Sequence, residues 1–239
     1  MEPLFAVGAS AVPCLAFAAF GAVAAVVIVL GILHARRQRE AMAALAAELG
    51  LQFYADDPWG LPERYAHFAL MGRGHSRRAS NVLAGTVGGR RCVAFNYRYT
   101  TGSGKNRTTH SYQAAVLDLP ILADHLWLRQ ESVFDTIASW VGRDDLDFES
   151  DEFSRRYYVK CERPKFAYDI FHTRLIEYLL GCGTAPSIEM NGPLIMVYEK
   201  PNGAEGVRRL IATAQQVVQS IPEYVLTERG IAQPPGANG

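Results

Sequence analysis

The chain has 239 residues, with 24 basic and 24 acidic side chains and 49% hydrophobic residues. A net charge of zero provides no global field that attracts polyanions, so we expect no nucleic-acid partner. After the first apolar stretch roughly 200 residues remain, enough for one domain with a hydrophobic core or for two small lobes. Three cysteines lie in this part. Their odd number and the lack of a C-x-x-C motif argue against a disulfide framework and a structural zinc site.

Residues 1–33 are predicted to form a transmembrane anchor. The stretch from Pro3 to Leu33 contains no charged side chain, and Cys14–Leu33 supplies twenty residues in a row. A bilayer core about 30 Å thick requires roughly 20 apolar helical residues. A cleaved signal peptide would carry positive charge before a shorter apolar segment, and a buried core helix would have a polar face. Both alternatives fit less well than a membrane helix.

The residues beside the anchor predict its orientation. Three arginines between residues 36 and 39 follow the apolar stretch, whereas Glu2 precedes it. Because Lys and Arg remain on the cytoplasmic side of a membrane, we expect the N-terminus outside and the following domain in the cytoplasm. These arginines also suit anionic lipid headgroups. Gly21 and Ala25 have the spacing of small residues that pack two membrane helices, so a homo-oligomer is one option.

The rest of the chain divides into three parts. Strong helix formers at residues 34–50 predict a juxtamembrane helix that continues out of the membrane and ends at Gly50, a common C-terminal cap. We assign residues 51–222 to a cytoplasmic α+β domain and residues 223–239 to a flexible tail. Within the domain, apolar side chains at helical spacing predict helices near residues 61–71, 133–141, 164–180 and 204–220.

Glycine-rich turns predict that the strands form hairpins. Gly88-Gly89 separates the first two expected strands, Gly102–Asn106 leads to a third that Pro120 should end, and Asn191–Pro193 should join two more. Because strands follow one another rather than alternate with helices, the predicted fold class is α+β with an antiparallel sheet. The expected strands are residues 80–87, 91–100, 107–119, 126–129, 155–162, 187–190 and 194–199.

Charge is unevenly distributed along the domain. Residues 63–107 contain nine basic side chains and one acidic side chain, a net charge of +8. Residues 118–152 contain ten acidic and two basic side chains, a net charge of −8. Two interpretations remain open. Either the segments pair with each other or solvate the surface, or the basic segment faces an anionic lipid or a phosphate ligand.

The loop Gly102–Asn106 is the candidate site for an anion. It does not match a Walker phosphate loop, because Tyr99 stands where the first glycine should be and Asn106 replaces Ser or Thr. Backbone N–H groups and nearby cations can still form a looser anion nest, and a plain hairpin turn is the alternative. The candidate anion-binding residues are Arg77, Arg78, Arg98, Lys105, Arg107 and His110.

No sequence pattern predicts catalysis, a metal or a cofactor. The histidines lack an H-E-x-x-H spacing, and no G-x-S-x-G motif is present. The acidic residues near 144–152 lack the glycine and the spacing of an EF-hand loop. The aromatic strand Phe95–Tyr99 lies near arginines, as in surfaces that stack nucleic-acid bases, but core packing explains it more simply. We predict no catalytic residue, no metal ligand and no cofactor.

Two parts of the sequence resemble a known group of bacterial proteins. Asp147–Lys160, followed by Phe166–Tyr168 and Leu175–Leu180, is similar to membrane-anchored domains of unknown function. Tyr97–His110 is similar to the part of these proteins in which a Gly/Lys loop after an aromatic strand joins two strands. The resemblance extends from near residue 40 to near residue 220. It implies a bacterial origin, hence the inner membrane, and a tethered α+β domain, without implying an activity or a ligand.

The sequence therefore favours a non-enzymatic interaction module at the membrane. Its partner would be another protein or an anionic lipid surface, because a single anchor, a basic flank and a basic segment occur together. The alternative is an enzyme or a receptor for a small anionic ligand, with a pocket lined by the hairpin loop at residues 98–110.

Overall fold

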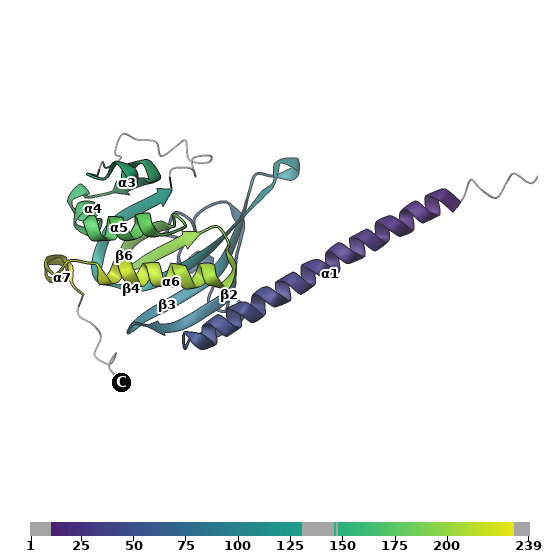
Figure 1. The fold of residues 1–239 in the computed structure, drawn as a ribbon, viewed down its shortest axis with the longest axis horizontal. Helices are drawn as coiled ribbons and strands as arrows, with labels where there is room; N and C mark the ends of the chain where they lie inside the picture. The colour runs from purple at the N-terminus through teal and green to yellow at the C-terminus, as the bar shows by residue number, and fades with distance from the viewer. Residues whose placement is uncertain (1–10, 131–145, 147, 232–239) are drawn as a thin grey trace, which may run out of the picture. The chain divides into compact units, whose positions relative to one another are not determined.

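An antiparallel sheet of six strands lies at the centre of the domain (Figure 1). The computed structural model describes residues 11–130, 146 and 148–231, with side chains from residue 21 onward. The helix expected at residues 133–141 lies outside the described residues. The fold class α+β is confirmed. The strands are β1 (Gln52–Asp56), β2 (His75–Val87), β3 (Arg90–Thr101), β4 (Thr108–Gln130), β5 (Tyr157–Cys161) and β6 (Ser187–Glu199).

The helices differ from the predicted ones in three places. The expected helix 61–71 is a single turn, α2, followed by turns up to β2. The expected helix 164–180 is broken into α4 and α5, because His172 leaves the helical conformation and begins α5. A further helix, α7, begins the segment expected to be a flexible tail. The described helices are α1 (Ala11–Glu48), α2 (Leu61–Arg64), α3 (Asp151–Arg156), α4 (Pro164–Ile170), α5 (Thr173–Gly181), α6 (Gly203–Gln219), α7 (Glu223–Arg229) and the 3₁₀ turn η1 (Gly104–Asn106).

Helix α1 is continuous from the apolar stretch to Glu48, as the sequence predicts, and Gly50 (φ +68°) follows its end. The chain forms two units, residues 1–41 and 42–239. Among the residues whose side chains are described, Gly21–Glu48 is one segment long and apolar enough to cross a membrane, by length and composition. Its large apolar side chains between Val23 and Leu33 are 43–63% exposed. In water such a surface would oppose folding, whereas a lipid environment would solvate it.

Strand β4 organises the sheet because it is 23 residues long and pairs along both edges. On one edge it pairs first with β3 and then, further along, with β5. On the other edge it pairs with β6 along both of its halves. Strands β1, β2 and β3 extend the sheet as a meander, and the predicted Gly88-Gly89 turn joins β2 to β3. The β4–β6 pairing therefore brings residues near 112 and 127 beside residues near 187 and 199.

Two predicted strand ends are wrong. Pro120 does not end its strand, and Asn191–Pro193 is not a hairpin turn, since β4 and β6 each continue through these residues. The register between the two strands shifts on both sides of Ala123, which pairs with Gly192. A bulge tolerates a proline, which has no N–H to donate, and the positive φ of Gly192 (+58°) continues the bend on the partner strand.

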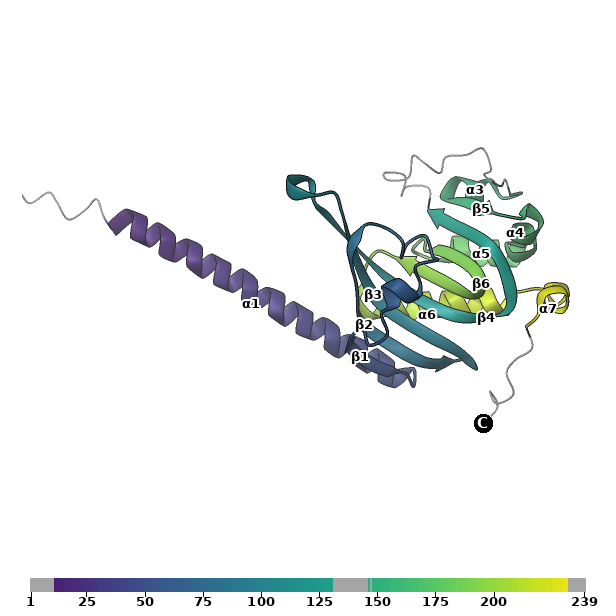
Figure 2. The same ribbon diagram turned by 180° about the vertical axis from the view of Figure 1, so that it is seen from behind.

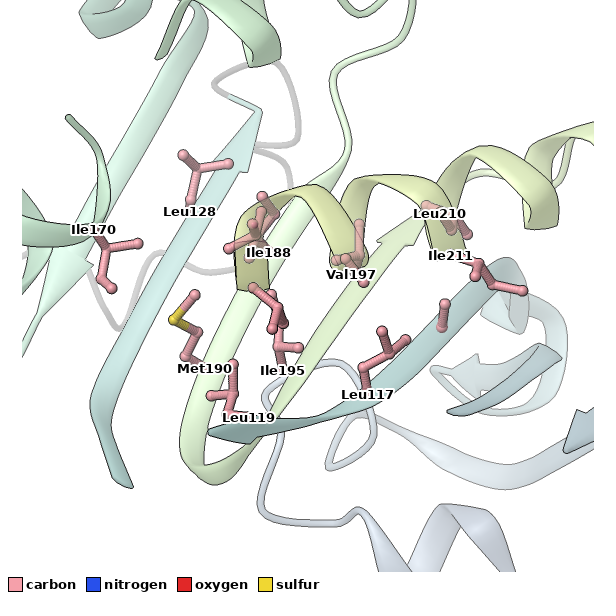
Figure 3. Close-up of a cluster of buried hydrophobic side chains, with 14 of the residues drawn as sticks. Leu117, Leu119, Leu128, Ile170, Ile188, Met190, Ile195, Val197, Leu210 and Ile211 are labelled. Carbon is pink, nitrogen blue, oxygen red and sulfur yellow. The ribbon is translucent and has the colours of Figure 1, made fainter. Parts of the chain in front are cut away.

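The two faces of the sheet carry separate apolar clusters, because successive strand residues point to opposite sides. Helix α6 covers one face, lying in front of the sheet in Figure 1 and behind it in Figure 2. Figure 3 shows Leu210 and Ile211 of α6 above Leu117 of β4 and Val197 of β6. The predicted inner stripe of α6 is confirmed, with each member at most 8% exposed: Val207, Leu210, Ile211, Ala214 and Val218.

The opposite face, here called the aromatic face, is covered by the segment at residues 57–74. This segment buries Phe68, Leu70 and Met71 completely against the strands. One N–H group of the segment bonds to the sheet, because the fully buried Glu189 carboxylate accepts the Ala69 N–H through both oxygens at 2.9 Å. The rings that define the face are Tyr65, Phe95, Tyr97, Tyr99, Tyr112 and Tyr198.

Candidate functional site

The six predicted anion-binding residues lie on β2, β3, β4 and the turn between β3 and β4, and the structure does not gather them into one site. Arg77 donates to the Met71 carbonyl at 3.0 Å and helps to close the segment over the aromatic face. Arg78 forms an exposed ion pair with Asp56 at 2.9 Å. Both guanidinium groups therefore already have partners within the domain. The anion-binding role of the six residues stays a prediction.

The remaining cations of this set lie on the hairpin of β3 and β4, whose tip projects from the sheet (Figures 1 and 2). Arg98 lies within the sheet opposite Ser111, and Lys105 and Arg107 lie at the tip. Gly102 (φ +74°) is required at its tip, because a Cβ there would lie 2.2 Å from the Asn106 carbonyl oxygen. Arg98, Lys105 and Arg107 are exposed. None of the three forms an ion pair with a carboxylate within the described part of the chain. The hairpin thus presents cations to solvent.

His110 turns away from the hairpin tip. Its ring stacks on Tyr99, with centroids 4.9 Å apart, and its Nε2 lies 2.8 Å from the Thr101 hydroxyl. Burial lowers the pKa of His110, and the charges of Lys200 and Arg73 lower it further. These two cations line a different site, which was not among the sites predicted from the sequence.

That site is a cavity of about 400 Å³ at the edge of the aromatic face. Its floor is built from β4 and β6, and its rim includes Arg73 from the covering segment and the turn at residues 183–185. No residue of the hairpin at 98–110 lines it, although the second sequence hypothesis placed its pocket there. The charged side chains around it are Arg73, Arg129, Arg156, Glu199 and Lys200.

Three aromatic rings form the floor of the cavity. The Trp127 indole N–H donates to the Tyr198 hydroxyl at 2.9 Å, and Tyr198 packs edge-on against Tyr112. All three rings are 5–6% exposed. Burial raises the pKa of Tyr198 to about 12, so its hydroxyl stays protonated at neutral pH. The rings of the floor are therefore uncharged, and the charge of the site comes from the cations around them.

The guanidinium groups of two arginines lie over the Trp127 ring. The distance from the guanidinium carbon to the ring centroid is 5.9 Å for Arg73 and 5.2 Å for Arg129. Arg129 is 7% exposed and also lies 4.6 Å from the Tyr158 ring. A guanidinium stacked through its flat face keeps its in-plane N–H donors pointing outward, where they can meet a carboxylate or phosphate.

Two more cations complete the rim. Arg156 is held in place by the C-terminal end of α5, since it donates to the Leu180 and Cys182 carbonyls at 2.8 and 2.9 Å. Lys200 donates to the Tyr112 hydroxyl at 3.3 Å and lies 4.3 Å from the centre of that ring. Among the described residues, no carboxylate forms an ion pair with Arg73, Arg156 or Lys200.

The only carboxylate that lines the cavity in the described part of the chain does not offset these cations. Glu199 forms an ion pair with Arg209 of α6 at 3.1 Å, and its side chain is 9% exposed. Counted over the described residues, the cavity therefore carries an excess of positive charge over an aromatic floor. Such a site suits an anionic ligand, because charge-assisted hydrogen bonds from Arg and Lys are among the strongest in proteins.

The sequence contained a weak signal for this site. Trp127 and Arg129 are two residues apart on β4, so they share a face of the sheet. Lys200 follows the last residue of β6, two residues after Tyr198. What the sequence could not show is that β6 pairs with β4 along its whole length. This pairing depends on the bulge at Pro120 and Gly192, which the sequence reading treated as a strand end and a turn.

The acidic and basic segments make little direct contact in the described part of the chain. One ion pair there joins them, between Arg91 and Asp118 at 2.7 Å. Asp124 instead pairs with Arg163 and with Arg229 of α7, the latter at 2.8 Å. Among the described residues, the acidic segment provides no carboxylate partner for Arg98, Lys105 or Arg107 of the hairpin.

The three cysteines of the domain are buried or half-buried. Burial raises the pKa of the Cys92 thiol to about 12, and it raises the pKa of Cys161 and Cys182 as well, so all three resist forming thiolates. Among the described residues no group of three or more His, Cys, Asp or Glu side chains is placed to hold a metal ion.

The chain is similar in fold to a mycobacterial lipid-transport factor. The crystal structure of the mycobacterial trehalose monomycolate transport factor A, TtfA, aligns with a TM-score of 0.53 over 83% of this chain and 99% of that chain. The two sequences are 12% identical over the alignment, so the likeness concerns the fold alone. No family model and no curated protein matches the sequence.

Proposed function

We propose that this chain is a membrane-tethered, non-enzymatic interaction module whose domain binds the anionic lipid surface of the bilayer that anchors it. The observation that carries the proposal is the combination of an exposed apolar helix with a projecting hairpin whose cations have no carboxylate partners among the described residues. Tethering keeps the local lipid concentration high, so a few weak contacts suffice. Each Lys or Arg near an anionic surface contributes about 1 kcal/mol.

The orientation follows the charge rule. Arginines after the apolar helix favour the N-terminus outside and the domain, residues 51–222, in the cytoplasm, here of a bacterial cell with the anchor in its inner membrane. The cytoplasmic leaflet is the one rich in anionic lipids, which agrees with a basic hairpin as the contact surface.

The fold of TtfA supports a role in lipid handling by analogy. That protein is a transport factor for trehalose monomycolate, a lipid. A tethered domain of the same fold with a cationic hairpin fits an accessory factor that positions lipids or a lipid-transporting partner at the membrane.

The test uses the full chain in nanodiscs of zwitterionic phosphatidylcholine or of anionic phosphatidylglycerol. Hydrogen exchange of the amides at residues 101–109 is measured in both lipids. We expect slower exchange in the anionic nanodiscs, and loss of this protection in a variant with Arg98→Gln, Lys105→Gln and Arg107→Gln. A matched variant, Lys160→Gln, changes a cation elsewhere on the domain and should keep the protection. Equal exchange in the two lipids contradicts lipid contact and leaves a protein partner as the function.

A further inference from the structure

We propose that the cavity that lies over β4 and β6 binds a phosphorylated sugar or polyol, either as a free phosphate ester or as the headgroup of a lipid. The inference goes beyond the proposed function, because the cavity and the hairpin share no residue. It rests on the cations, the neutral polar groups and the size of the cavity.

The cations define where the anionic group would bind. Arg73 stacks over Trp127, and Lys200 lies beside Tyr112, so the two approach the floor from different strands and loops. Arg156 adds a third positive charge at the rim of the cavity. Phosphate accepts several charge-assisted hydrogen bonds at once, and Arg and Lys are the side chains that recognise it most often. A single carboxylate would use fewer of these donors.

The neutral part of the lining defines the rest of the ligand. Thr184, Ser187 and Asn202 line the same cavity and carry hydroxyl or amide groups that pair with sugar or polyol hydroxyls. The aromatic floor offers little exposed ring surface, since its rings are 5–6% exposed. A flat aromatic ligand would therefore find few stacking contacts, whereas a polar, many-hydroxyl ligand would find partners.

The size agrees with one small ligand. About 400 Å³ lies at the lower end of the range of small-molecule sites, roughly 300–1,000 Å³. This accommodates a phosphorylated sugar or a lipid headgroup. A long acyl chain would have to remain outside, in the bilayer.

Isothermal titration of the full chain in phosphatidylcholine nanodiscs tests the proposal, with glucose 6-phosphate, glucose and inorganic phosphate as probes. We expect glucose 6-phosphate to bind at least tenfold more tightly than either other probe. Arg73→Gln and Lys200→Gln should each weaken it about tenfold, since each removes one charge-assisted contact. Arg98→Gln and Lys105→Gln are the matched controls on the hairpin and should bind as the parent does. Arg73→Lys and Lys200→Arg keep the charge and should lose less than the Gln variants.

Several outcomes overturn the proposal. These are no binding of glucose 6-phosphate, equal binding of glucose 6-phosphate and glucose, equal binding of glucose 6-phosphate and phosphate, or equal loss in the cavity and hairpin variants.

The source of the ligand follows from repeating the titration in phosphatidylglycerol nanodiscs. Loss of glucose 6-phosphate binding there assigns the cavity to a lipid headgroup, and retained binding assigns it to a soluble ester. If anionic nanodiscs do not slow hydrogen exchange at residues 101–109, by contrast, only the proposed function is contradicted.

Discussion

His125 and Glu189 form a hydrogen bond of 2.8 Å between Nε2 and Oε1 on adjacent strands of the aromatic face, and the Glu189 side chain is fully buried. The same carboxylate accepts the Ala69 N–H. It therefore fastens the segment at residues 57–74 to the sheet and supports the wall of the cavity that Arg73 supplies.

Because of the His125–Glu189 pair, we expect the stability of the domain to depend on pH. The hydrogen bond to Glu189 raises the pKa of His125, while burial opposes the rise. A raised pKa in the folded state stabilises the fold below the unfolded pKa of about 6.5, and this contribution is lost as pH rises through the folded pKa. We therefore expect the melting temperature to fall as the pH is raised from about 6 to about 8.5, a range that begins near the pKa of an unfolded histidine. His125→Gln should flatten the profile, whereas His75→Gln should keep it. An unchanged slope in His125→Gln contradicts the assignment.

Removing the Glu189 carboxylate should lower the free energy of unfolding more than removing the His125 ring. Glu189→Ala leaves the half-buried Ala69 N–H without its acceptor, so we expect about 2–3 kcal/mol of destabilisation by denaturant unfolding. Glu189→Gln keeps an acceptor oxygen and should cost less. The exposed pair partner Asp56→Ala serves as the comparison and should cost under about 1 kcal/mol. Equal losses for Glu189→Ala and Asp56→Ala would show that the carboxylate does not fasten the segment.

The attachment of the short helix α7 to β4 should depend on the Asp124 carboxylate, which pairs with Arg229. Burial acts to raise the pKa of this carboxyl, but hydrogen bonds from Arg163 and Arg229 lower it overall. Asp124→Ala should therefore release α7, with faster hydrogen exchange at residues 223–229 and about 1–3 kcal/mol of lost stability. Glu205→Ala removes an exposed partner of Arg208 and should leave α7 protected. Protection of α7 that survives Asp124→Ala contradicts this role of the carboxylate.

A side chain at Gly192 should destabilise the bulge between β4 and β6. Its φ of +58° disfavours any side chain, so Gly192→Ala is expected to cost about 1 kcal/mol or more in thermal unfolding. Gly181→Ala is the matched control, because Gly181 lies at the end of α5 with open space around it and no positive φ. A neutral Gly192→Ala would mean that the bulge does not require the left-handed conformation.

The sequence predicted what depends on local pattern. The α1 helix, the Gly88-Gly89 hairpin, the meander through β3 and the inner stripe of α6 follow from periodicity and turn residues, and each is present. Pro120 and Gly192 misled the prediction because their local preferences favour a strand end and a turn. The pairing of β4 with β6 overrides them, since it satisfies backbone groups on both sides of the bulge.

The candidate site was harder to predict for the same reason. The six predicted residues lie between positions 77 and 110, on β2, β3, β4 and the turn between β3 and β4, and none of them lines the cavity. The cavity cations come from four separate segments, near residues 73, 129, 156 and 200. Only the pairing of distant strands places them together, and no spacing within one segment could have shown it.

The central claim is that the apolar helix anchors the domain on the cytoplasmic side of a membrane. Reporter fusions at the C-terminus of the full chain, expressed in a bacterial host, test this most directly. We predict that a green fluorescent protein fusion fluoresces in the membrane fraction and that an alkaline phosphatase fusion is inactive. Replacing the three arginines between residues 36 and 39 by glutamine should weaken this orientation. Active alkaline phosphatase with a dark fluorescent fusion, or recovery of the parent chain in the soluble fraction, would contradict the claim.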